Sequence, residues 1–264
     1  MSTEGSAGFP TGTFTPAPGR GRVGRMLAVH ARTELALTLR NGEQVLLTLL
    51  IPIALLIGLT LVVDVVDMPE PRVASVTARV FALAVMSSAF TGQAIALGFD
   101  RRYGVLKRLA ATAMPRWLLV AGRLTAGVAV VAIQLVLLGV VAAVLGWRPQ
   151  LAGLLWAVPV VLVGTLAFGA LGVLLGGALK AEVVLALANI VWFVLLLAGG
   201  IIVAADQLPD GFATVVRLLP SGALTEALHG TLGGGGAPGV RPVLVLAGWA
   251  AVAGVAASRT TRLS

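Results

Sequence analysis

Few side chains in this sequence have the types and spacing that catalysis requires. Ser221 lies eight residues before His229, but the G-x-S-x-G sequence of a serine nucleophile is absent. The other histidine, His30, begins "HARTE", which lacks the H-E-x-x-H order of a zinc-binding helix. The chain has no cysteine, which excludes disulfides, thiolate catalysis and cysteine-based metal sites. We therefore predict neither an enzyme nor a metal site.

The lysines bear on ATP hydrolysis. A phosphate-binding loop needs G-x-x-x-x-G-K-[ST], because its backbone N–H groups hold the phosphates and its lysine reaches them. Lysine occurs here at Lys107 and Lys180, and each follows a leucine instead of a glycine. ATP-driven work would therefore require a partner chain, in which ATP and Mg²⁺ would be used, and we expect no cofactor on this chain.

Three amides lie in the middle of long apolar stretches, at Gln93, Gln134 and Asn189. They are candidates for a substrate path, or they form interhelical hydrogen bonds, which contribute about 0.6 kcal/mol each in lipid. Carriers coupled to ions commonly place acids or histidine at mid-membrane. Because no acid lies deep in an apolar stretch, the pattern disfavours an ion-coupled carrier without excluding it.

Charge is concentrated in one segment, "FDRRYGVLKRLAATAMPRWLLVAGR" at 99–123. Its six basic residues face a single acid, Asp100; they are Arg101, Arg102, Lys107, Arg108, Arg116 and Arg123. Drawn as one helix over 100–113 that ends before Pro115, the segment gathers an apolar arc of Val105, Leu106 and Leu109, with Arg102 also inside the arc. Such a helix would lie along a membrane surface, with its basic side facing water or a cytoplasmic partner.

The elements that must position these residues are membrane spans. The chain is 58% hydrophobic and 11% charged, and its mean hydropathy is +1.00, whereas a soluble domain is about 25% charged. Six segments approach the roughly 20 residues that cross a bilayer. They are 44–63, 76–98, 117–145, 151–179, 183–204 and 242–258. The net charge of +8 comes from residues that flank these spans, which is typical of membrane topology and not of nucleic-acid binding.

The basic residues predict the orientation. With a cytoplasmic amino terminus and six spans, five of the 19 basic residues fall outside, namely Arg72, Arg79, Arg148, Arg217 and Arg241. The others fall inside, as the positive-inside rule requires. Both termini and the 99–123 segment are therefore expected in the cytoplasm. The simpler interpretation of this segment is that its basic residues only keep the loop in the cytoplasm.

Three flanking segments complete the plan. Residues 1–22 are rich in Gly, Pro, Ser and Thr and predict a disordered cytoplasmic tail. Residues 23–43 predict an amphipathic helix in the headgroup plane, although His30 and Glu34 intrude on its apolar side. Residues 205–241 predict two helical pieces, broken by Pro209 and Pro220, that lie at the outer interface or dip back into the membrane.

The 99–123 segment, with the residues that follow it, resembles the signature between the second and third spans of ABC type-2 transporter permeases. The matching residues are Asp100, Arg101, Arg102, Gly104, Leu106, Lys107, Arg108, Leu109, Thr112, Arg116, Gly122 and Arg123. Ala-Met before Pro115 departs from the Thr-Pro-like segment of that pattern. Beyond this loop the resemblance rests on outline: an amphipathic lead-in helix, six spans, and a long outer segment before the last span.

The resemblance implies an all-α polytopic permease domain over 23–264 in a bacterial plasma membrane. In such permeases this loop docks as a coupling helix on a separate ATP-binding subunit. The coupling residues it implies are Asp100, Arg101, Arg102, Gly104, Leu106, Lys107, Arg108, Leu109, Thr112 and Pro115. It also implies two permease copies or a paired permease, export of the solute, and drug-resistance-type substrates that confer antibiotic resistance. The alternatives are a non-transporting membrane scaffold and an ion-coupled secondary carrier.

Overall fold

The computed structural model describes residues 13, 15, 21–61, 71–111, 114–198, 201 and 208–260, and every regular element within them is a helix. In chain order these are α1 (Val23–Arg40), α2 (Gly42–Leu61), α3 (Arg72–Val85), η1 (Met86–Gly92), α4 (Gln93–Arg102), α5 (Val105–Ala110), α6 (Arg116–Val144), α7 (Leu151–Ala178), α8 (Ala181–Ala198), α9 (Asp210–Leu218), α10 (Pro220–Leu232) and α11 (Val240–Thr260). The predicted tail at 1–22 lies almost entirely outside the described residues.

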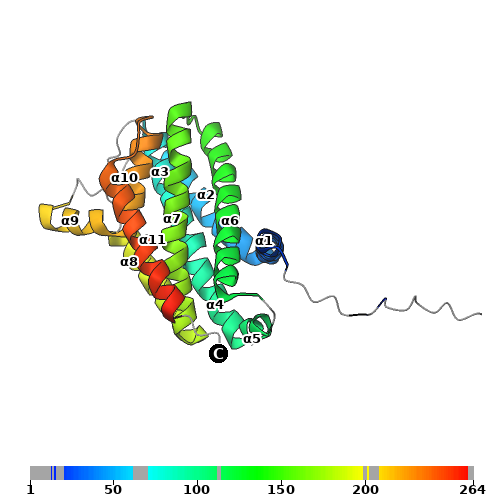
Figure 1. Cartoon of the computed structure of the whole chain (residues 1–264). Coiled ribbons are helices and arrows are strands. Elements are labelled where there is room, and N and C mark those ends of the chain that lie inside the picture. Colours follow the sequence, from blue (N-terminus) through cyan, green and yellow to red (C-terminus); the bar gives the residue numbers. More distant parts are fainter. Residues whose placement is uncertain are drawn as a thin grey trace, which may run out of the picture.

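Four helical stretches in the described part of the chain are long and apolar enough to cross a membrane. They are Arg72–Arg102, Trp117–Val144, Leu151–Ala178 and Val240–Arg259. The other two predicted spans fall on shorter apolar helices, Thr48–Leu61 and Ala181–Leu197. Figure 1 shows α6 and α7 side by side, with α11 crossing α7 and with α4 and α5 at the lower end of the bundle. The helical fold is confirmed, and six spans remain a prediction.

The stretch from 72 to 102 is one helical rod that changes its winding in the middle. Residues 86–92 form the π-helix η1 between the α-helices α3 and α4. The two serines of η1 bond to different neighbours. Trp192 Nε1 of α8 donates to Ser87 Oγ over 2.9 Å, and Ser88 Oγ donates to Gln134 Oε1 of α6 over 2.6 Å. Interhelical bonds of this kind stabilise a wide turn whose own backbone bonds are less favourable.

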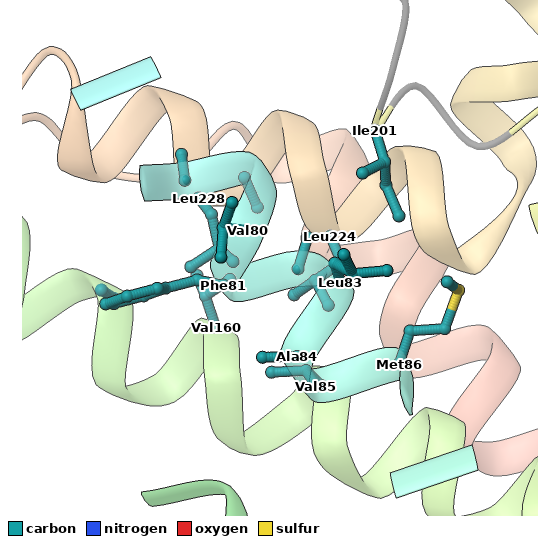
Figure 2. Close-up of a cluster of buried hydrophobic side chains, with 14 of the residues drawn as sticks. Val80, Phe81, Leu83, Ala84, Val85, Met86, Val160, Ile201, Leu224 and Leu228 are labelled. Atoms are coloured by element: carbon teal, nitrogen blue, oxygen red, sulfur yellow. The ribbon is translucent and has the colours of Figure 1, made fainter. Parts of the chain in front are cut away.

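The α3 helix is the centre of the core. Its residues 74–85 are all buried, and Figure 2 shows its side chains lying between Val160 of α7 and Leu224 and Leu228 of α10. Arg79 also lies within α3 and is only 3% exposed. Its assignment to the outer side of the membrane remains a prediction.

The predicted outer segment does form two helices, and Pro209 and Pro220 mark where they start. Pro209 is the N-cap of α9, and Pro220 is the first residue of α10. Their environments differ. Apolar residues such as Phe212 are exposed on α9, whereas α10 is buried against α3, α7 and α11. The helix α10 is therefore part of the protein core, and the location of the two helices at the outer interface or in the membrane remains a prediction.

Close packing of α7 against the 72–102 rod depends on two glycines four residues apart. A Cβ at Gly172 would lie 2.7 Å from the Phe90 carbonyl oxygen, and one at Gly176 would lie 2.5 Å from that of Ala94. Real Cβ atoms essentially never approach an oxygen so closely. This G-x-x-x-G pair therefore allows two backbones to meet, as small residues do in lipid.

Replacing Gly176 by alanine is expected to destabilise the protein by about 1–3 kcal/mol, the usual cost of overpacking a tight interface. The clash involves backbone atoms, which cannot turn away. The matched control is Gly248→Ala in α11, where the added Cβ would meet nothing within 4 Å. Thermal unfolding of the purified protein in mild detergent should fall for the first variant and be unchanged or slightly raised for the second. Equal melting temperatures would contradict the packing argument.

Candidate functional site

The charged segment is not one helix. The prediction of a continuous helix over 100–113 is wrong, because α4 ends at Arg102 and α5 begins at Val105. Between them Gly104 has φ +70°, a left-handed conformation that side chains with a Cβ disfavour. The Gly104 N–H donates to the Arg101 carbonyl over 3.1 Å. A glycine-dependent turn therefore ends the long rod and redirects the chain into α5.

The helix α5 has one side against the protein and one side open. Leu106 is 4% exposed and belongs to a cluster with Leu97, Val173 and Ala257, and Leu109 packs against the same cluster. The apolar arc predicted for a membrane surface is therefore directed at the end of the bundle. Lys107 and Arg108 are exposed, as is Tyr103 in the turn. We call Tyr103, Lys107 and Arg108 the outward face of this segment.

The three charged residues before the turn reach different helices. Arg123 Nη2 of α6 donates to Asp100 Oδ2 and lies 3.6 Å from Glu34 Oε2 of α1. The Arg123 side chain is 6% exposed, whereas those of Asp100 and Glu34 are 28% and 20% exposed. One buried cation thus joins acids from two helices that are distant in sequence. Removing a member of a buried charge group costs far more than the group's net contribution.

The neighbouring arginines contact the end of α7 and the start of α8. Arg101 Nη1 donates to the carbonyl oxygens of Gly176 and Leu179, over 3.3 and 3.0 Å. These groups lie at the end of α7, where carbonyls lack helical partners and the helix dipole attracts a cation. Arg102 Nη1 donates to Glu182 Oε1 in the first turn of α8. That pair is solvent-exposed, so it contributes at most about 1 kcal/mol.

A histidine completes the contact between α1 and α6. His30 is 6% exposed, and its Nε2 donates to the Leu119 carbonyl oxygen over 3.2 Å. The ring lies over Gly122, where an added Cβ would be 2.1 Å from His30 Cδ2. The Gly122–Arg123 pair therefore has two separate roles: the glycine admits the His30 ring, and the arginine binds the acids. The predicted coupling residues did not include His30, Glu34 or Arg123.

The signal for this contact was visible in the helical wheel of residues 23–43. His30 and Glu34 are polar residues on the side that also carries Met26 and Leu27. The part of this side that carries His30 and Glu34 faces α6. Val23 and Leu37, which were predicted on the same side, are 40% and 61% exposed. The helix α1 ends at Arg40, earlier than predicted. Its place in the headgroup plane remains a prediction.

The segment thus combines two sets of residues. Asp100, Arg101 and Arg102 form ion pairs and hydrogen bonds with α6, with the end of α7 and with α8, and we call them the anchor residues. The outward face leaves its polar atoms open on α5 and the preceding turn. Pro115 is the N-cap of α6, and Thr112 lies outside the described residues.

The three predicted amides do not lie together. Gln134 is 4% exposed; it accepts from Ser88 and donates to the Thr48 carbonyl over 2.7 Å. Gln93 and Gln134 both line one groove between α1, α2, α6 and the 72–102 rod. Asn189 lies on an exposed side of α8 and donates to the Leu185 carbonyl of its own helix. The structure therefore groups the two glutamines and separates the asparagine from them.

Comparison with known proteins identifies a family. Residues 27–232 match the family model described as "ABC-2 type transporter". The match spans more than half of the chain and includes most of α1, the anchor residues and α10. No curated protein sequence matches the chain.

Proposed function

Because the chain belongs to the ABC-2 type transporter family, we propose that it is the membrane-spanning subunit of an ATP-driven exporter and that its outward face docks on a separate ATP-binding subunit. The observation that supports this proposal most directly is the arrangement around α5. A six-residue helix with an exposed basic face is attached, through the anchor residues just before it, to α6, α7 and α8, and through Arg123 to α1.

Docking requires exposed groups, and the outward face has them. Lys107 and Arg108 are exposed and lie in the last turn of α5. Their charges suit an acidic groove on a partner, which would speed association and fix its orientation. Leu106 and Leu109 hold α5 against the end of the bundle instead of offering an apolar surface. We therefore assign partner recognition to charge and to Tyr103, and assign attachment to the two leucines.

The anchor residues support a route for mechanical work. A push on α5 reaches α4 through the Gly104 turn. From there Asp100 leads to α6 and α1 through Arg123, while Arg101 and Arg102 lead to α7 and α8. Rigid-body motion of helices about such contacts is one way to alternate access to a solute path. The chemistry that supplies the push, ATP hydrolysis with Mg²⁺, belongs to the proposed partner.

Further features of the proposal follow from the same family. We propose two permease copies, or one copy with a similar partner, in a bacterial plasma membrane with both termini in the cytoplasm and six spans per copy. Export of an amphipathic drug or natural product would place the protein among antibiotic-resistance transporters. The excess of basic residues on the α5 side of the chain supports this orientation.

The test is capture of the partner by a tagged chain in mild detergent. We expect the captured protein to carry a phosphate-binding loop and to hydrolyse ATP. Replacing Lys107 and Arg108 together by glutamate should lower the captured amount at least tenfold, because two favourable charge contacts become repulsive. Membrane insertion should be unchanged.

The control is Lys180→Glu, which changes an exposed basic residue at the end of α7, outside α5. This variant should capture as much ATPase as the unmodified chain. If no ATPase accompanies the unmodified chain, or if the double variant captures it equally well, docking through the outward face is wrong. The first of these results would favour a non-transporting scaffold in which the basic loop only fixes topology.

A further inference from the structure

An open groove lies beside α6. Its volume is about 830 Å³ when the open solvent at its mouth is counted. Its lining follows α6 from Arg123 to Leu137, which is about 21 Å of helix at 1.5 Å per residue. The opposite walls come from α1, α2 and the 72–102 rod. The space is therefore long, and it is open to the surface.

The polarity of the lining changes along this length. Glu34 and Arg123 lie at one end, and they are the charged residues that line the groove. Gln93 comes next, and its amide forms no hydrogen bond within the described part of the chain. Farther along, Ile133 and Leu137 line the groove and are 42% and 43% exposed. The polar residues beside them, Thr48, Ser88 and Gln134, are hydrogen-bonded to one another. A molecule that matches this order has a charged head, a short polar region and an apolar chain.

The sign of the head group follows from the ion pairs. Arg123 is bonded to Asp100, which does not line the groove, and is almost fully covered. Glu34 is farther from Arg123, at 3.6 Å, and its side chain is 20% exposed. Arg123 is therefore neutralised by Asp100, and the carboxylate of Glu34 is the excess charge that faces the groove. A cation is attracted to that end and an anion is repelled.

We propose that this groove binds a single-chain amphiphile with a cationic head, with the head beside Glu34 and the chain along Ile133 and Leu137. That the bound amphiphile is the exported solute rests on the proposed function. Binding itself does not, since the groove is built from this chain alone. Gln93 would donate or accept a hydrogen bond with the polar region behind the head. This bond would give a partner to the Gln93 amide, which has none within the described part of the chain.

The test measures binding to the purified full chain without any ATP-binding subunit. The probes are dansyl-labelled dodecylammonium and dansyl-labelled dodecyl sulfonate, which share the label and the chain and differ in head-group charge. We expect saturable binding of the ammonium probe, at least about tenfold tighter than that of the sulfonate. Glu34→Gln should abolish most of this difference by weakening the ammonium probe.

A second variant tests the location without touching any charge. Ala96 is exposed and lines the groove, so Ala96→Trp should fill it and lower the affinity of both probes at least tenfold. Ala186→Trp on the exposed side of α8, away from the groove, is the matched control and should bind normally. Melting temperatures of both variants show whether each is folded.

Several results would overturn the proposal. They are equal affinity for the two probes, an ammonium affinity that Glu34→Gln leaves unchanged, and normal binding by Ala96→Trp. A change in oligomeric mass caused by Ala96→Trp would instead identify the groove as a contact between copies. None of these results depends on capture of an ATPase, so each is distinguishable from a failure of the proposed function.

Discussion

Replacing Arg123 by methionine should give the largest loss of stability and of coupling in this chain. The substitution keeps the length and apolar stem of the side chain but leaves Asp100 and Glu34 facing each other without their shared cation. We expect destabilisation of about 3 kcal/mol, the lower end of the range for breaking a buried ion pair, because both acids retain some contact with water. Thermal unfolding in mild detergent measures this loss, and ATP hydrolysis in the assembled complex measures coupling.

A triple variant separates the two effects. Arg123→Met combined with Asp100→Asn and Glu34→Gln removes all three charges, so no carboxylate is left unpaired. Stability should return to within about 1 kcal/mol of the original, since neutral replacements of a buried charge group are often tolerated. Coupling should stay impaired, because the connection between α4, α6 and α1 has been weakened. A triple variant with normal transport-coupled hydrolysis would show that these charges serve stability alone.

Substitutions at Gly104 should change coupling in the order set by backbone preference and not by side-chain size. An added Cβ at Gly104 would meet nothing within 4 Å, so the effect is conformational. At φ +70° asparagine is tolerated better than alanine, and alanine better than valine, with strain of about 1–3 kcal/mol for unsuitable residues. We expect transport-coupled ATP hydrolysis to fall slightly for Gly104→Asn and about fivefold or more for Gly104→Ala.

Gly146 supplies the matched control. It also has a left-handed φ, +96°, and open space around its Cβ position, but it lies in the connection between α6 and α7, far along α6 from Arg123. Gly146→Ala should cost similar stability and leave coupling intact. If both alanine variants reduce hydrolysis equally, the Gly104 turn has no special role. Gly104→Asp should abolish coupling while insertion into the membrane stays normal, as the negative charge also opposes docking.

The long apolar helices could be predicted closely, because residue type alone decides whether a segment enters lipid. The spans predicted at 117–145 and 151–179 agree with α6 and α7 to within about a residue. The last span, 242–258, was barely long enough as predicted and became the 21-residue α11. The burial of α10 could not be predicted in this way. Its Gly, Ser and Thr content resembles a loop, and its burial follows only from contacts with α3 and α7.

The candidate site was predicted in part. Sequence pattern identified the charged segment and the exposure of Lys107 and Arg108. It did not show that Asp100 and Arg101 point back into the bundle, because their partners lie 23 to 78 positions away along the chain. The break at Gly104 had a local signal, a glycine inside a helical pattern. The helical wheel alone could not decide whether that glycine interrupts the helix.

The π-helical turns at 86–92 determine which way α4 faces relative to α3. A π turn holds one residue more than an α turn, and each residue advances an α-helix by about 100°. Winding all the residues of 86–92 as a regular α-helix would therefore rotate α4 about its axis by roughly that angle relative to α3. Asp100 would then point away from Arg123, although every amino acid of the anchor remained in place. Deleting one residue from 86–92 at the same time would restore the direction of Asp100, so a one-residue gap in this stretch is compatible with the same anchor.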